Sequence, residues 1–239
     1  MSKKSSHRLP LIVKSFAIAS MIGLCLPALP SDARFNPGGT VGKPGNRRGL
    51  ATRGGGCKVS GEPTLTALVP KNNMGLSASA TPTLHWFIPQ NTYKFMTFSL
   101  YVMDAEDNPQ DLIYTSRLEV SGQPELASVT IPEQDTAALE PGVNYRWVVK
   151  LHCSETSRRG LSAMGWLNYI PPSPEVMNQL ASAPPEDQYN IYAEAGYWYD
   201  AVRELVAQKR INPQSPTVKQ AWKALMESEH VQLSQLATQ

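Results

Sequence analysis

The sequence has little that marks an enzyme or a nucleic-acid-binding protein. None of the motifs Gly-x-Ser-x-Gly, His-Glu-x-x-His or Ser-x-x-Lys occurs among its 239 residues. Lysine and arginine (22) exceed aspartate and glutamate (20) only slightly. A uniformly basic nucleic-acid binder is therefore excluded. The missing motifs favour a non-enzymatic role and leave the question of a reaction open.

Long hydrophobic runs are also scarce, and the one clear run lies near the N-terminus. Residues Ser15–Leu29 are apolar, and they follow a start that is rich in lysine and arginine. The run is too short for a comfortable membrane span. Small residues at Ser31 and Ala33 suit a signal-peptidase cut after Ala33. The pattern predicts a signal peptide over residues 1–33 and a mature protein in the periplasm or outside the cell.

Two other interpretations of this N-terminal segment remain open. It could stay uncleaved as an anchor, or Cys25 could accept a lipid, although Leu24 stands where a small residue is expected. No later segment approaches 18 consecutive apolar residues. We therefore expect membrane contact only through the signal segment.

Cysteine is rare, with three residues in the chain. Removal of Cys25 with the signal peptide leaves Cys57 and Cys153, which an oxidising compartment favours as a disulfide. His152 beside Cys153 raises the alternative of a cysteine nucleophile, but adjacent strand residues point to opposite faces. The remaining Cys and His residues lack zinc-site spacing. We expect no metal and no cofactor.

The mature chain opens with a glycine-rich basic segment, residues 34–56. A phosphate-binding loop would need Ser or Thr after Lys43, and Pro44 stands there instead. The composition predicts a flexible arm, or a tether that acts through its surface charge. The rest is acidic, because residues 59–239 hold 12 basic and 19 acidic side chains.

Short alternating segments separated by turn residues follow over residues 57–170. Met96–Met103 alternates apolar with other side chains, and Tyr145–Leu151 follows the turn signal Glu140-Pro141-Gly142. About seven such strands predict an immunoglobulin/fibronectin III-like β-sandwich. Tyr145 is either a corner tyrosine, whose hydroxyl bonds nearby backbone, or a plain core aromatic.

The C-terminal part changes to helical periodicity. A proline-rich linker is expected at residues 171–185 and a helical hairpin, packed on the sandwich, at residues 186–239. Asn212-Pro213 ends the first helix, and Ser215-Pro216 begins the second. One helical face is formed by Ile191, Ala195, Trp198, Val202 and Leu205. The whole is therefore mainly β with an α appendage.

Few side chains stand out as ligand contacts. Tyr197 lies off the apolar helical face and is the better exposed aromatic residue for binding a partner or a sugar ring. His85 alternates with Leu84 and Trp86 on a strand, at the rim or in the core. The acidic turn that begins at Asp104 lacks the glycine and the terminal glutamate of a calcium loop, so a polar hairpin turn is expected.

Several motifs together resemble a known family. They are Thr52–Cys57, Leu65–Pro70, Pro82–Thr83, Leu139–Gly142, Gly165–Trp166 and Gly196–Ala201. They span most of the mature chain and are similar to those of exported cyanobacterial proteins catalogued as domain of unknown function 928. The resemblance implies export and the order arm, sandwich, helices. It assigns no reaction, ligand or functional residue.

These features predict an exported envelope protein that serves as a protein-interaction or structural module. The alternative is a carbohydrate-binding or hydrolytic envelope protein, which a deep pocket with two carboxylates would favour. The partner would be an unidentified envelope protein or a glycan, and no nucleic acid is expected.

Overall fold

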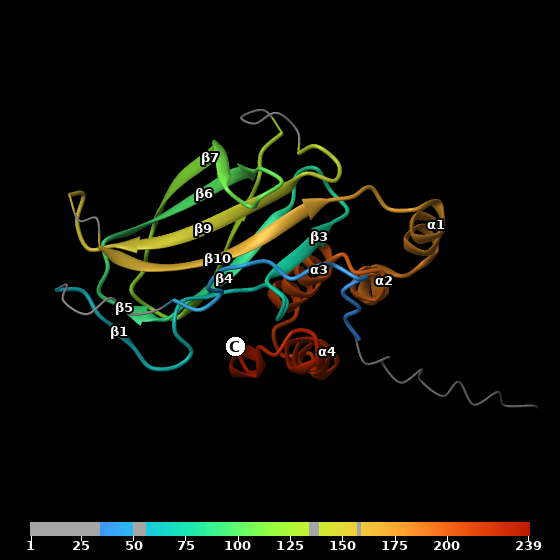
Figure 1. The fold of residues 1–239 in the computed structure, drawn as a ribbon. Coiled ribbons are helices and arrows are strands. Elements are labelled where there is room, and N and C mark those ends of the chain that lie inside the picture. Colours follow the sequence, from blue (N-terminus) through green and yellow to red (C-terminus); the bar gives the residue numbers. More distant parts are fainter. Residues whose placement is uncertain (1–33, 50–55, 134–138, 157–158) are drawn as a thin grey trace, which may run out of the picture.

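A computed structural model describes residues 34–49, 56–133, 139–156 and 159–239, so the expected signal peptide lies outside the described residues. This part of the chain is mainly β, with four α-helices towards the C-terminus (Figure 1). The strands are β1 (Val59–Ser60), β2 (Thr66–Ala67), β3 (Met74–Ser77), β4 (Thr83–Ile88), β5 (Gln90–Asn91), β6 (Phe95–Met103), β7 (Pro109–Glu119), β8 (Glu125–Thr130), β9 (Asn144–His152) and β10 (Gly160–Tyr169). The helices are α1 (Pro174–Ser182), α2 (Gln188–Glu194), α3 (Trp198–Ile211) and α4 (Pro216–Glu227), with short 3-10 turns at Pro185–Asp187 and Ser234–Leu236.

The strands form two larger sheets and one short pair. One sheet has five strands in the order β3-β10-β9-β6-β7, and the other has three in the order β2-β4-β8. All pairs are antiparallel except β3 with β10, and β1 pairs with β5. Strand β9 shows why these segments are strands, because its burial alternates residue by residue.

The two larger sheets share a core of aromatic side chains. The ring of Trp86 on β4 lies 5.9 Å from Phe98 on β6 and 6.3 Å from Trp147 on β9, centroid to centroid. All three side chains are fully buried. Because Trp86 belongs to the three-stranded sheet and the others to the five-stranded sheet, these rings join the two sheets face to face.

Tyr145 lies where the chain enters β9, and its hydroxyl accepts a hydrogen bond from the backbone N–H of Glu140 at 2.8 Å. This is the bond expected of a corner tyrosine. Burial raises the pKa of this hydroxyl. The bond fixes the turn that precedes β9 against the strand itself.

The expected disulfide is confirmed. Cys57 and Cys153 are bonded, with their Cα atoms 5.7 Å apart and 96 positions apart in sequence. The bond links the segment before β1 to the end of β9. The alternative of Cys153 as a nucleophile is therefore wrong, because a bonded sulfur is not a thiolate.

Two expectations about the helical region are corrected. The segment at residues 171–185, expected as a linker, contains α1, because Ser173 caps the helix and Pro174 occupies its first position. The helix expected through Ile191 and Leu205 is two helices, α2 and α3. The chain breaks at Gly196, where φ is +87° and an added Cβ would lie 3.0 Å from the backbone oxygen of Asn36.

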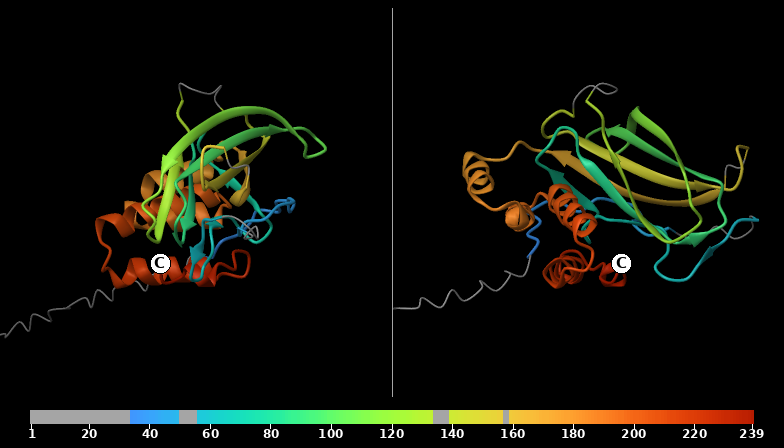
Figure 2. Two further views of the ribbon diagram at one scale, coloured as in Figure 1. Left: turned by 90° about the vertical axis from the view of Figure 1, so that its left-hand side faces the viewer. Right: turned by 180° about the vertical axis from the view of Figure 1, so that it is seen from behind.

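Helix α3 lies against strands β3 and β4, one from each of the larger sheets (Figures 1 and 2). Trp198 is fully buried, and its Nε1 donates to the backbone oxygen of Leu68 at 2.7 Å. The hydroxyl of Tyr199 accepts from Trp147 Nε1 at 2.8 Å and donates to the backbone oxygen of Trp166 at 2.7 Å. Each buried polar atom of these rings thus has a partner, which makes the helix part of the common core.

The expectation of a free arm is wrong for residues 34–49, drawn in blue in Figure 1. Phe35 is buried and meets Trp198 edge to face, with ring centroids 5.1 Å apart. The backbone oxygen of Asn46 accepts from the N–H of Met164 in one sheet, and that of Arg47 accepts from the N–H of Ala67 in the other. The arm therefore bridges both sheets; residues 50–55 lie outside the described part.

Candidate functional site

The two side chains expected to contact a ligand are both buried. His85 on β4 is 2% exposed, and burial, reinforced by the charge of Arg210, lowers its pKa to about 3. It is therefore neutral at physiological pH. Tyr197 is 6% exposed, and its hydroxyl donates to the backbone oxygen of Pro171 at 3.3 Å. The expectation that Tyr197 is exposed is corrected, because the break at Gly196 turns its ring towards the body.

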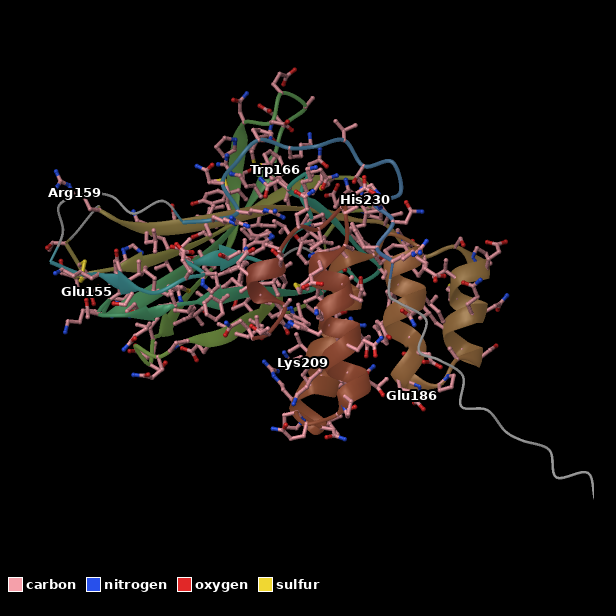
Figure 3. All side chains as sticks on the ribbon, turned by 90° about the horizontal axis from the view of Figure 1, so that it is seen from below. Glu155, Arg159, Trp166, Glu186, Lys209 and His230 are labelled. Carbon is pink, nitrogen blue, oxygen red and sulfur yellow. A yellow bond between two sulfur atoms is a disulfide. The ribbon has the colours of Figure 1, made fainter. Side chains whose placement is uncertain are left out.

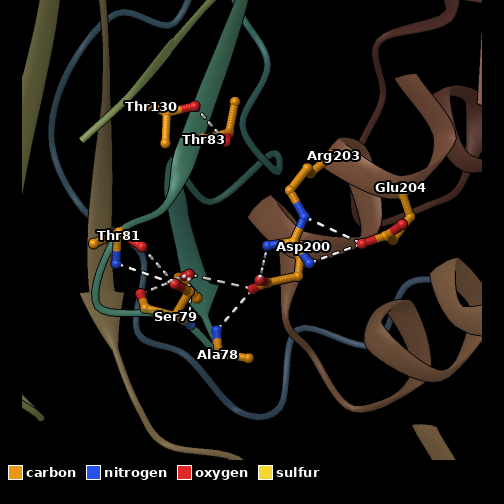
Figure 4. Close-up of polar contacts among 9 residues, drawn as sticks. Ala78, Ser79, Thr81, Thr83, Thr130, Asp200, Arg203 and Glu204 are labelled. Atoms are coloured by element: carbon orange, nitrogen blue, oxygen red, sulfur yellow. Dashed lines mark hydrogen bonds and ion pairs between the residues drawn. The ribbon is translucent and has the colours of Figure 1, made fainter. Parts of the chain in front are cut away.

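Asp200 is a buried acid at the contact between α3 and β3 (Figure 4). One carboxylate oxygen accepts from the backbone N–H of Ala78 at 2.7 Å and from Ser77 Oγ at 3.2 Å. The other accepts from Arg203 Nη1 at 3.1 Å. Burial raises the pKa of Asp200, although each of these partners lowers it. Because its oxygens are engaged by the fold itself, the group positions α3 on the sheet.

The acidic turn between β6 and β7 pairs the carboxylate of Asp104 with its own backbone N–H groups. Asp104 Oδ1 accepts from the backbone N–H groups of Glu106 and Asn108 at 3.0 and 2.7 Å. Across the described residues, no three His, Cys, Asp or Glu side chains converge as metal ligands. Within the same ranges, no helix has the length and apolar character that crossing a membrane requires.

A cationic hollow lies where α3 ends and α4 begins. We call it the lysine pocket; its volume is about 580 Å³, and Lys209, Lys219 and Lys223 line it together with Pro213, Trp222 and Ala237. Figure 3 labels Lys209 near the end of the helical pair. The C-terminal segment forms the remaining wall.

The helical hairpin brings these lysines together. Lys219, Trp222 and Lys223 occupy positions i, i+3 and i+4 of α4, which places them on one face. The turn between the helices returns this face towards Lys209 in the last turn of α3. Trp222 is buried beneath them, and its Nε1 donates to the backbone oxygen of Leu236 at 2.8 Å. The Lys209 ammonium lies 4.4 Å from the Trp222 ring centroid and also bonds the backbone oxygen of Gln239.

Among the residues that the structure describes, no aspartate or glutamate lines the lysine pocket. In the described part of the chain, none of its three lysines forms an ion pair with Asp or Glu. Burial lowers the pKa of Lys209, and the charge of Lys219 lowers it further. Lys209 bonds the backbone oxygen of Gln239, whereas Lys219 and Lys223 have no acidic partner among the described residues. The like charges of these lysines favour the entry of an anion.

A second hollow of about 580 Å³ lies between the arm and the end of α4. Its walls carry both signs of charge, with Arg34 from the arm, and Glu227, Glu229 and His230 from the chain at and after the end of α4. This mixture selects no ligand charge. The lysine pocket is the stronger candidate because its side-chain charges have one sign.

Sequence reasoning missed the lysine pocket. Lys209 lies in the last turn of α3, where the helix dipole favours a cation, so its position alone does not indicate a site. The spacing of Lys219 and Lys223 on one helical face is visible in the sequence. Their proximity to Lys209 depends on the path of the turn that contains Pro213, which the periodicity does not encode.

Comparison with known proteins adds a family assignment. A family described as Domain of Unknown Function (DUF928) matches residues 48–239. The matched segment contains both larger sheets, the disulfide and all four α-helices. A search of curated proteins finds no match to the chain.

Proposed function

The chain belongs to the DUF928 family, and we propose that it is an exported envelope protein that acts by binding and not by catalysis. The lysine pocket carries this proposal, because it is an open hollow whose side-chain charges are all positive. A binding protein needs such a surface, whereas hydrolysis of a glycosidic bond needs paired carboxylates that this pocket lacks.

The proposed location is the periplasm or the outside of a cyanobacterial cell, after cleavage near Ala33. The charged start followed by the apolar run at Ser15–Leu29 supports export. The disulfide between Cys57 and Cys153 is consistent with an oxidising compartment. N-terminal sequencing of the native protein should give Arg34; recovery of an intact Met1 in the cytosol would contradict the proposal.

We further propose that the scaffold is an immunoglobulin/fibronectin III-like sandwich. Three observations support this: the two facing sheets, the corner hydrogen bond of Tyr145, and the buried Trp147 two residues later. In such scaffolds the sheets provide rigidity, and function lies in surfaces added to them. The C-terminal helices would be that addition here.

The experiment that tests a binding role is a pull-down with the mature protein, residues 34–239, from an envelope fraction of its own cell. We expect specific retention of an envelope protein or glycan. The control is a variant in which Lys219 and Lys223 are both replaced by Gln. Retention of nothing by either protein would contradict the binding role.

A further inference from the structure

The lysine pocket is lined by positive charges, a few apolar side chains and side-chain amides. Its apolar atoms come from Pro213, Trp222 and Ala237. Its neutral polar groups are Gln214, Gln220, Thr238 and Gln239. Lysine stems add further hydrocarbon surface below each ammonium. A ligand that fits must therefore present an anionic group, several hydroxyls and a ring with C–H faces.

Some of these polar groups are engaged by the fold, and others are available. Lys219 donates to Gln214 Oε1 at 2.7 Å. Within the described part of the chain, the Gln220 amide and the Thr238 hydroxyl make no side-chain hydrogen bond, and Lys223 has no polar partner. All three side chains are exposed. The pocket can thus offer one amide, one hydroxyl and a free ammonium without breaking an existing bond.

The lysines of the pocket offer separate positive charges to an anionic ligand. No arginine lines the pocket, so the planar two-point recognition typical of arginine is missing there. The lysine ammoniums are separate point charges around a hollow large enough for a ligand of several rings. A bare hydrocarbon acid would use only the positive charges, whereas a ligand with hydroxyls can also bond the Gln220 amide and the Thr238 hydroxyl.

We propose that the lysine pocket binds an acidic saccharide, with its carboxylates on Lys219 and Lys223, its hydroxyls on the Gln220 amide and the Thr238 hydroxyl, and its ring C–H faces on Pro213 and Ala237. This inference rests on the proposed binding function and names its ligand class. Residues 59–239 hold more acidic than basic side chains, whereas the charged side chains of the pocket are all lysines. The positive charge of the pocket therefore directs an anion to this end of the molecule.

The test measures binding of trigalacturonate to the protein, residues 34–239, by calorimetry at low ionic strength. The matched ligand is the fully methyl-esterified trisaccharide, which keeps the rings and loses the charges. We expect heat of binding with the acid and none with the ester. Equal binding of the two would overturn the assignment, and so would failure of the acid to bind the wild-type protein.

The matched variants are K219Q/K223Q and K58Q/K94Q. Each pair removes two positive charges from exposed side chains, but Lys58 and Lys94 lie near β1 and β5, outside the pocket. We expect K219Q/K223Q to bind trigalacturonate about tenfold more weakly or worse, and K58Q/K94Q to bind it as the wild type does. Equal weakening by both pairs would mean that only net charge matters, and it would overturn the proposed site.

Tetraglutamate separates the saccharide from an acidic peptide. Binding of tetraglutamate as tight as that of trigalacturonate, with the same loss in K219Q/K223Q, would make the pocket a peptide site and overturn the ligand class. The pull-down separates this failure from failure of the binding function. An envelope component retained equally by the wild type and by K219Q/K223Q would support binding elsewhere and contradict only the lysine pocket.

Discussion

The arm at residues 34–49 and helix α1 differ in a way that their local structures do not indicate. The arm has no helix or strand of its own beyond one isolated bridge from Arg48 to Thr66. It nevertheless buries Phe35 and crosses both sheets. Helix α1 is regular and capped, yet none of its residues is buried. It lies at the edge of the molecule in Figure 1 and in the right-hand view of Figure 2.

The difference follows from where each backbone finds its hydrogen-bond partners. A helix pairs its interior N–H and C=O groups within itself, so α1 can lie away from the core without leaving these backbone groups unpaired. An irregular segment can be buried only where neighbouring elements supply partners. The arm meets this condition, because Asn46 and Arg47 each accept from a different sheet. Regular local structure and integration into the fold are thus separate properties.

The largest expected effect is at the point where the arm docks. Replacement of Trp198 by Ala should reduce the free energy of unfolding by about 3–5 kcal/mol. The change removes a fully buried ring, its contact with Phe35 and the partner of the Leu68 oxygen. Urea titration measures it. Met177→Ala is the control, since Met177 on α1 is 57% exposed and should change stability by about 0.5 kcal/mol or less.

An unchanged midpoint for the Trp198→Ala variant would show that the aromatic end of α3 is not docked in solution. The arm would then lose its main apolar support, and the contrast between the arm and α1 would disappear. In that case the helical face would become a candidate binding surface in place of the lysine pocket.

A smaller effect is expected from the arm's polar contacts. The guanidinium of Arg47 donates to the backbone oxygens of Val69, Val231 and Gln232, and burial lowers its pKa to about 10. Arg47→Met should cost about 2 kcal/mol, because these carbonyls lose a charged donor. Arg48→Met is the matched control, since exposed Arg48 makes one side-chain bond within the described part of the chain, to Gln235. Equal losses of stability in the two variants would show that the hydrogen bonds of Arg47 to the three backbone oxygens make no specific contribution to stability.

Much of the sheet region, and the turn between α3 and α4, could be predicted from the sequence, because the signals for them are local. Alternation in Tyr145–Leu151 identifies a strand, and two cysteines in an exported chain identify a disulfide. Asn212-Pro213 and Ser215 mark the turn between α3 and α4. Each of these signals lies within a few residues of the feature that it predicts.

The arm, the break at Gly196 and the lysine pocket could not be predicted, because each depends on residues that are distant in sequence. Gly196 requires its positive φ where the chain passes the backbone of Asn36. Arg47 contacts residues 184 and 185 positions away. The composition of the arm predicts flexibility because the arm has little apolar surface of its own. Composition carries no information on the hydrogen-bond partners that the rest of the fold provides.

The smallest expected effect is at the cap of α1. Ser173 Oγ accepts from the backbone N–H of Val176 at 3.4 Å, and Ser215 Oγ makes the same bond with Val218 at 3.3 Å at the start of α4. Ser215→Ala should cost about 1 kcal/mol of global stability, because α4 is anchored in the core through Trp222 and Leu225. Ser173→Ala should weaken α1 by a similar amount locally, seen as faster amide hydrogen exchange, while the urea midpoint stays unchanged. The reason is that α1 buries no residue, so its fraying is not coupled to unfolding of the sheets. Equal midpoint shifts in the two variants would instead make α1 part of the cooperative unit, and the contrast between a buried irregular arm and a peripheral regular helix would fail.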